Sequence, residues 1–217
     1  MDQKSIEKNL KSINTVINHR AILIAVSKYV SSVEIKMAYD LGQRDFGENR
    51  VPELLEKANT LKDDCPDIKW HMIGNLQSNK IKKLLQCPNL VSVQSIYEKK
   101  HIELFNEHLK SKLNFFIQVN TSGEENKGGV ETKEEILELF KLVNNSYFKF
   151  SGLMTMGKLN GTKEDIRQSF THLKNISHDV SSELSLPVLC SMGMSGDFET
   201  ALECGSKIVR VGSSIFK

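Results

Sequence analysis

Short apolar runs alternate with amphipathic segments along the chain. Residues 2–18 place apolar side chains at helical spacing, which predicts an amphipathic helix. The run ILIAVSK at 22–28 is continuous, apolar and rich in β-branched residues, as in a strand buried on both faces. The next segment, 31–42, has an N-terminal serine, a helical body and a final glycine. The chain therefore opens as helix, strand and helix.

The same alternation continues to the end of the chain. The predicted strands cover 22–28, 45–47, 68–74, 90–96, 114–120, 148–156, 188–194 and 208–216. The predicted helices between them cover 31–42, 51–61, 79–85, 98–111, 132–144, 163–180 and 197–204. Strict alternation of this kind requires parallel strands that are joined by helical crossovers.

These elements predict an α/β fold, a closed (β/α)8 TIM barrel that forms one domain over 1–217. The helix before the first strand is extra, and we expect it to replace the missing eighth outer helix. An open doubly wound sheet is the alternative fold. No Gly-x-Gly-x-x-Gly motif follows the first strand, which disfavours that alternative.

Composition excludes several classes of function. The chain has 29 basic and 27 acidic residues, a net charge of +2, so we expect no binding to nucleic acid or to a membrane surface. No apolar run has the length of a signal peptide core or of a spanning helix. The cysteines form no Cys-x-x-Cys pair, which disfavours a zinc site and a disulfide framework. We expect a cytoplasmic monomer that contains no metal.

Lys28 is the first candidate for chemistry. The active face of such a barrel lies at the carboxyl ends of its strands, and Lys28 ends the first predicted strand. We expect burial at the barrel mouth to disfavour its ammonium form, and a lysine of that kind can form an imine with an aldehyde or ketone. The alternative is a lysine that extends its charge into solvent at a strand end.

A phosphate site is the second candidate, at the loops after the last two strands. Gly212, Ser213 and Ser214 offer hydroxyls and lightly covered backbone N–H groups, and Ser191, Gly193 and Gly196 stand in SMGMSGDF. The alternative is that these glycines only form tight turns. A lysine and a phosphate site together predict a ligand with a carbonyl and a phosphate. Pyridoxal 5'-phosphate and the sugar phosphate of a Schiff-base aldolase both fit.

Several motifs make the chain similar to one known family. The segments are AVSK (25–28), FGENR (46–50), WHMIGNLQSNK (70–80), IQVNTSGEENKGGV (117–130), GLMTMG (152–157), SMGMSGDFETALECGS (191–206) and VRVGSSIF (209–216). They resemble the pyridoxal phosphate homeostasis protein family, the small barrels related to the N-terminal domain of alanine racemase. The resemblance implies a barrel of the fold type III pyridoxal phosphate enzymes. The chain departs from many relatives in having Tyr29-Val30 after Lys28.

The resemblance also implies roles for individual residues. Lys28 would form the internal aldimine with pyridoxal 5'-phosphate. Arg210 would either face the pyridine nitrogen, keeping it unprotonated, or support the phosphate side. The other implied cofactor-binding residues are Asn49 near the ring, and Ser191, Met192, Gly212 and Ser213 at the phosphate.

Three functions remain open at this point. The first is intracellular homeostasis of pyridoxal phosphate, by storage, buffering or delivery to pyridoxal-phosphate-dependent apoenzymes. The second is an amino-acid racemase or decarboxylase, and the third is a Schiff-base sugar-phosphate aldolase. A racemase needs a base on each face of the ring. Tyr29 is expected to point away from Lys28, and no second domain is expected, so we predict binding without amino-acid turnover.

Three further side chains receive structural interpretations. His71, on the third predicted strand, is expected to face the barrel mouth in a structural role. His101 lies in a predicted helix and is expected at the surface. Glu48 is expected to be a carboxylate at a helix start, where it stabilises the helix dipole without any catalysis.

Overall fold

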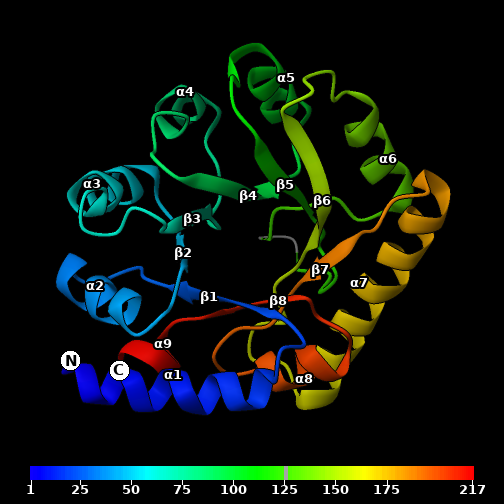
Figure 1. Ribbon diagram of the computed structural model, residues 1–217. Coiled ribbons are helices and arrows are strands. Elements are labelled where there is room, and N and C mark those ends of the chain that lie inside the picture. Colours follow the sequence, from blue (N-terminus) through cyan, green and yellow to red (C-terminus); the bar gives the residue numbers. More distant parts are fainter. Residues whose placement is uncertain (125–126) are drawn as a thin grey trace.

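The barrel predicted from the sequence is confirmed by a computed structural model, which describes residues 1–124 and 127–217. Residues 125 and 126, within the motif at 117–130, lie outside the described residues. The parallel strands pair in chain order, and β1 also pairs with β8, which closes the barrel (Figure 1). The strands are β1 (Ile22–Val26), β2 (Asp45–Glu48), β3 (Lys69–Met72), β4 (Leu90–Ile96), β5 (Leu113–Gln118), β6 (Phe148–Met154), β7 (Leu189–Ser191) and β8 (Ile208–Val211).

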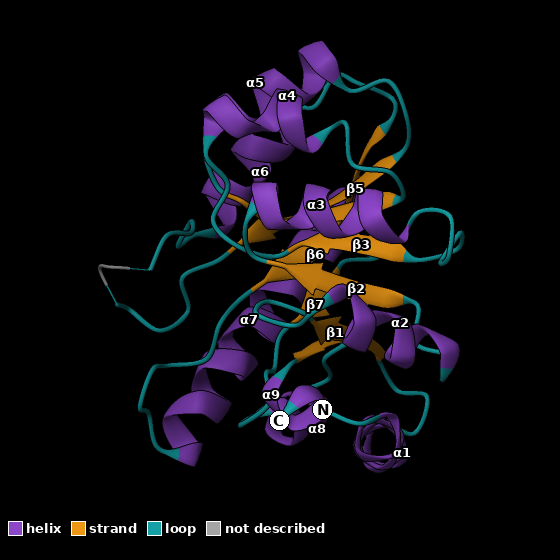
Figure 2. Cartoon of the chain, turned by 90° about the vertical axis from the view of Figure 1, so that its left-hand side faces the viewer, coloured by secondary structure: helices purple, strands orange, loops and turns teal. Residues whose placement is uncertain are grey.

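Helices surround the strands, and the two ends of the chain lie close together (Figures 1 and 2). The helices are α1 (Gln3–Ile17), α2 (Ser32–Asp40), α3 (Val51–Leu61), η1 (Ser78–Lys80), α4 (Ile81–Leu84), α5 (Lys99–His108), α6 (Lys133–Lys141), α7 (Lys163–Leu184), α8 (Phe198–Glu203) and α9 (Ser213–Phe216). The extra N-terminal helix, α1, packs against α2, α8 and α9. No helix among the described residues is long and apolar enough to cross a bilayer.

Local sequence signals start several of these helices. Ser31, Thr132 and Thr162 each accept a bond from the third helical N–H, and an acidic side chain at that position bonds back to the cap. This capping box satisfies backbone donors that a helix otherwise leaves unpaired. These side chains therefore mark the residues at which α2, α6 and α7 begin.

The predicted strands extend too far at their carboxyl ends. β7 ends at Ser191, and the last strand ends at Val211, so the prediction of strands over 188–194 and 208–216 is wrong beyond these residues. Residues 213–216 form the short helix α9, in which Ile215 is fully buried. Ile215 made the segment resemble a strand because it packs in the core, although its backbone is helical.

The interior of the barrel holds polar groups as well as a small apolar cluster. Ile24, Phe116, Met154 and Ile208 form that cluster. His71 lies inside the barrel and contacts Ser92 Oγ through Nδ1 at 2.7 Å and Asp45 Oδ1 through Nε2 at 2.9 Å.

Two expectations for histidines are therefore wrong. Asp45 is the first residue of β2, so His71 faces the amino ends of the strands and not the barrel mouth. His101 is fully buried on α5 and not at the surface, and this burial lowers its pKa.

Candidate functional site

A cavity of about 680 Å³ opens at the carboxyl ends of the strands. Its volume is in the range of sites for small molecules. Five of the predicted cofactor-binding residues line it, namely Lys28, Asn49, Arg210, Gly212 and Ser213. The predicted residues Ser191 and Met192 do not. The remaining lining residues are Val26, Tyr29, Val30, Ile73, Gly74, Met154, Met156, Met194, Ser195, Gly196, Phe216 and Lys217.

Lys28 lies in a tight turn at the rim of this cavity. The Val30 N–H donates to the Ser27 carbonyl at 2.9 Å, and Tyr29 has a φ of +65°. A positive φ at that position of a turn suits glycine or asparagine, so a tyrosine there is strained. Tyr29 is 90% exposed and also borders the cavity.

The Lys28 side chain is exposed, and the expectation that it is buried is therefore wrong. Among the described residues it makes no hydrogen bond or ion pair. Its amine is therefore accessible to a ligand and is not held by a neighbouring carboxylate.

A buried ion pair anchors the start of this turn. Lys57 Nζ donates to the Ser27 carbonyl at 2.8 Å and to Glu48 Oε1 at 2.7 Å. The Ser27 hydroxyl donates to the same Glu48 oxygen at 2.7 Å. Glu48 is only 1% exposed, so the interpretation of Glu48 as a helix-start carboxylate is wrong. Its charge instead holds the residue that precedes Lys28.

Arg210 forms the floor of the cavity and is 4% exposed. Its guanidinium donates from Nη1 to Ser191 Oγ and from Nη2 to the Thr155 carbonyl, both at 2.7 Å. Burial lowers the pKa of Arg210 to about 10, and the charge of Asp197 opposes this shift. Arg210 thus remains a cation at neutral pH, held by two uncharged acceptors.

Ser191 and Met192 lie below and behind the floor. Ser191 is fully buried, accepts from Arg210 and donates to Gln94 Oε1 at 2.7 Å. The Met192 N–H donates to the Ile208 carbonyl at 3.0 Å, and its side chain packs in the main hydrophobic core. Both residues are therefore already committed to contacts within the protein.

A cluster of donors lies where Gly212 and Ser213 begin α9. The backbone N–H groups of Gly212 and Ser214 both donate to Ser195 Oγ, at 3.2 and 3.4 Å. A Cβ on residue 212 would lie 3.0 Å from the Val26 carbonyl oxygen, which explains the glycine. Sequence reasoning missed Ser195. The second serine of SMGMSGDF, which directly follows the predicted strand 188–194, was the available signal.

Asn49 borders the cavity on the side of β2 and β3. The chain after β3 passes so close to Asn49 that a Cβ on Gly74 would collide with the Asn49 backbone. A glycine at 74 is therefore needed to bring these two segments together at the rim.

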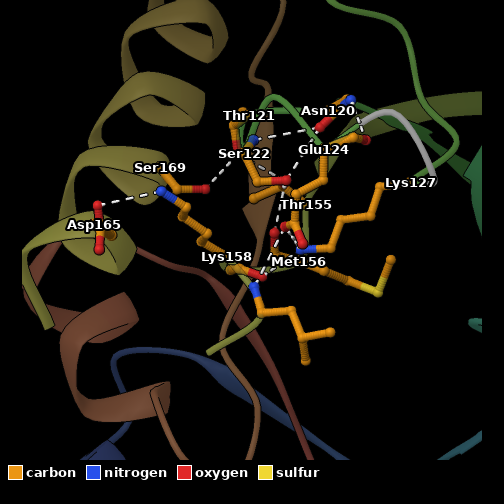
Figure 3. A network of polar contacts seen from close by, with 12 residues as sticks. Asn120, Thr121, Ser122, Glu124, Lys127, Thr155, Met156, Lys158, Asp165 and Ser169 are labelled. Atoms are coloured by element: carbon orange, nitrogen blue, oxygen red, sulfur yellow. Dashed lines mark hydrogen bonds and ion pairs between the residues drawn. The ribbon is translucent and has the colours of Figure 1, made fainter. Parts of the chain in front are cut away.

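A network of hydroxyls supports the ends of β5 and β6 (Figure 3). Thr121 Oγ1 lies 2.9 Å from Thr155 Oγ1 and 2.6 Å from Ser169 Oγ. Lys127 Nζ donates to the Gly157 carbonyl at 2.7 Å. This network fixes the segment in which the Thr155 carbonyl accepts from Arg210 and Met156 lines the cavity.

Comparisons with known proteins agree with this architecture. A family model described as the N-terminal domain of alanine racemase matches residues 1–217. The pyridoxal phosphate homeostasis protein of Schizosaccharomyces pombe is 44% identical over 200 residues, which cover 90% of this chain and 83% of that protein. Alanine racemase of Clostridium difficile 630 shares the fold, with a TM-score of 0.78 and 16% identity over 98% of this chain and 56% of the racemase.

A related solved structure contains a ligand. The structure of PipY from Synechococcus elongatus PCC7942 with PLP bound has a TM-score of 0.85 and 28% identity, and the match covers 98% of this chain and 100% of that one. Given the family model that spans all 217 residues and the relative with 44% identity, the chain belongs to the pyridoxal phosphate homeostasis protein family, whose barrel is that of the alanine racemase N-terminal domain.

Proposed function

We propose that this protein binds pyridoxal 5'-phosphate as an internal aldimine on Lys28 and serves in cofactor homeostasis. It would store or buffer the cofactor, or deliver it to apoenzymes that depend on it. One observation carries the proposal. A single cavity brings together an exposed lysine, a cluster of hydroxyl and backbone donors, and a buried arginine. The cofactor supplies an aldehyde that condenses reversibly with amines.

The lining residues fit the parts of this cofactor. Ser195, Gly212 and Ser213 would bind the phosphate, since all three line the cavity at the start of α9. We assign the phosphate to Ser195 in place of Ser191 and Met192, because those two residues are buried below the floor. The cavity also offers apolar surface for the ring, from Ile73, Met154 and Met156, beside Asn49.

Arg210 would face the pyridine nitrogen and not the phosphate. Its guanidinium is held at the floor by Ser191 and Thr155, whereas the phosphate donors lie around Ser195. A cation beside the nitrogen keeps that nitrogen unprotonated and weakens the ring as an electron sink. Such a site is suited to holding the cofactor and poorly suited to amino-acid chemistry.

We also propose that the protein does not turn amino acids over. Racemisation needs a base on each face of the ring. Tyr29 and Lys28 leave the same turn, and among the described residues no cysteine or histidine lines the cavity. Incubation with the enantiomers of common amino acids tests this proposal. Racemisation or decarboxylation at ordinary enzyme rates would contradict it.

An absorbance scan tests the binding proposal. The protein mixed with pyridoxal phosphate should show a yellow imine band that borohydride removes, and Lys28→Ala should lack this band. Lys217 lines the same cavity, so Lys217→Ala is the matched control and should stay yellow. A parent protein that stays colourless would overturn the proposal and favour the aldolase alternative, which cleavage of sugar phosphates would then test.

A further inference from the structure

A chain of three buried side chains runs from the cavity floor into the barrel. Arg210 on β8 donates to Ser191 on β7, and Ser191 donates to Gln94 on β4. Arginine can only donate, so the Ser191 oxygen must accept from it. The single hydroxyl proton of Ser191 must then point elsewhere, and Gln94 Oε1 receives it at 2.7 Å. The direction of every bond in the chain is therefore determined.

The buried amide of Gln94 destabilises the fold, so its presence requires another explanation. Its Nε2 group is buried and has no hydrogen-bond partner among the described residues. A buried donor without a partner is destabilising, whereas an apolar side chain of similar shape would avoid this penalty. The advantage of an amide at this position must come from its carbonyl, and that carbonyl contacts Ser191.

The partners of Arg210 are also uncharged. Ser191, Gln94 and the Thr155 carbonyl contribute no negative charge to the floor. Asp197 is the described acidic group whose charge acts on Arg210, and its carboxylate accepts from the Met194 N–H. The guanidinium is thus held in place by neutral contacts, and it forms no ion pair among the described residues.

We infer that Gln94 is a positioning residue, which acts through Ser191 to hold the Arg210 guanidinium beneath the cofactor ring by neutral contacts. This inference rests on the proposed function. Gln94 does not line the cavity, so it acts on a bound cofactor only through the other two side chains. Replacing its carbonyl should release Arg210, and replacing its neutral amide by a carboxylate should compensate the arginine charge.

Two substitutions at one position separate these effects. Gln94→Leu should weaken the binding of pyridoxal phosphate about tenfold, the factor expected for one hydrogen bond of 1.4 kcal/mol. Gln94→Glu should raise the pH midpoint of the yellow band by about one unit, because a less positive floor favours the protonated imine. The measurements are cofactor titration, the pH titration of the absorbance band, and thermal melting of the cofactor-free protein.

A pair of serine variants provides the matched control. Ser191→Ala should weaken cofactor binding as Gln94→Leu does. Ser92→Ala should not, although it also removes a buried hydroxyl inside the barrel, because Ser92 contacts His71. If either Gln94 variant fails to fold, this pair of serine variants still tests whether the hydrogen-bonded chain to Arg210 supports cofactor binding. Equal binding constants and midpoints in all folded variants would overturn the inference while leaving a yellow parent protein. A parent that binds no cofactor would overturn the proposed function, and the inference with it.

Discussion

The cavity holds Lys28 and Arg210 in opposite ways. At the rim, contacts with Glu48 and Lys57 fix Ser27, the residue before Lys28, and the Lys28 side chain remains exposed and unpaired among the described residues. At the floor, hydrogen bonds hold the guanidinium of Arg210 itself. The rim therefore fixes a backbone and leaves the side chain free, whereas the floor fixes the side chain.

The difference matches the two tasks that we propose. An amine that forms a reversible imine must reach its ligand, exchange a proton and move, so only the base of its side chain can be held. A cation that sets the electrostatics of a ring must not move, because its effect depends on distance. Charged partners hold the backbone at the rim. Neutral partners hold the Arg210 side chain at the floor, where a carboxylate would offset the charge of the arginine.

Breaking the ion pair at the rim should have the largest effect. Lys57→Met leaves the Glu48 carboxylate buried without its charged partner, which typically costs about 3–5 kcal/mol. We expect the free energy of unfolding to fall by about 3 kcal/mol, since Lys57 is partly exposed. Cofactor binding by the protein that remains folded should also weaken, because Ser27 loses a contact. Denaturant unfolding and cofactor titration measure the two effects.

Two controls separate charge from packing in that experiment. Adding Glu48→Gln to Lys57→Met removes the unpaired charge and should recover part of the lost stability. Lys36→Met breaks the exposed pair with Asp40, which should change the free energy of unfolding much less, because solvent screens that pair. A Lys57→Met protein as stable as Lys36→Met would show that the buried pair does not anchor the rim.

Adding a side chain at Gly74, on the rim, should have the next largest effect on stability. Gly74→Ala would place a Cβ against the Asn49 backbone, and relief of that collision should cost about 2 kcal/mol. The shift of Asn49 should also weaken cofactor binding while leaving the contacts of Arg210 intact. Gly196 also lines the cavity, but a Cβ added there would meet no neighbouring atom. Gly196→Ala is therefore the control for folding. Equal melting temperatures of the two variants would contradict the expectation.

The rim and the floor also differ in how far the sequence predicts them. Lys28 follows from position, because it ends a predicted strand with a clear apolar pattern, whereas the role of Arg210 follows from the family resemblance. The contacts that hold these two residues cannot be predicted from the sequence. Lys57 lies on the second strand-to-helix unit and reaches back to Ser27, and Gln94 meets Ser191 across the barrel. Such pairs depend on the closed sheet, which a local pattern does not specify.

The loops beyond β7 and β8 show a second limit of the sequence. Met192 and Met194 after β7, and Ile215 and Phe216 after β8, are apolar, so the predicted strands ran through these segments. Their side chains do pack, as Met192 and Ile215 show, but their backbone leaves the sheet. Periodicity reports burial and not hydrogen bonding, so it gave no sign that Ser195 Oγ accepts from the backbone N–H groups of Gly212 and Ser214.

The smallest expected effect concerns the strain at the rim. Tyr29→Gly removes the left-handed strain of about 1–2 kcal/mol but makes the unfolded chain more flexible. We expect a net stabilisation of about 0.5 kcal/mol, with slightly weaker cofactor binding because the turn that presents Lys28 becomes less rigid. Ser185 has the same kind of φ, +53°, at the end of α7. Ser185→Gly should therefore stabilise the fold similarly and leave cofactor binding unchanged. If both variants bound the cofactor as the parent does, the left-handed conformation of Tyr29 would have no role in cofactor binding. The difference between rim and floor would then rest on the ion pair.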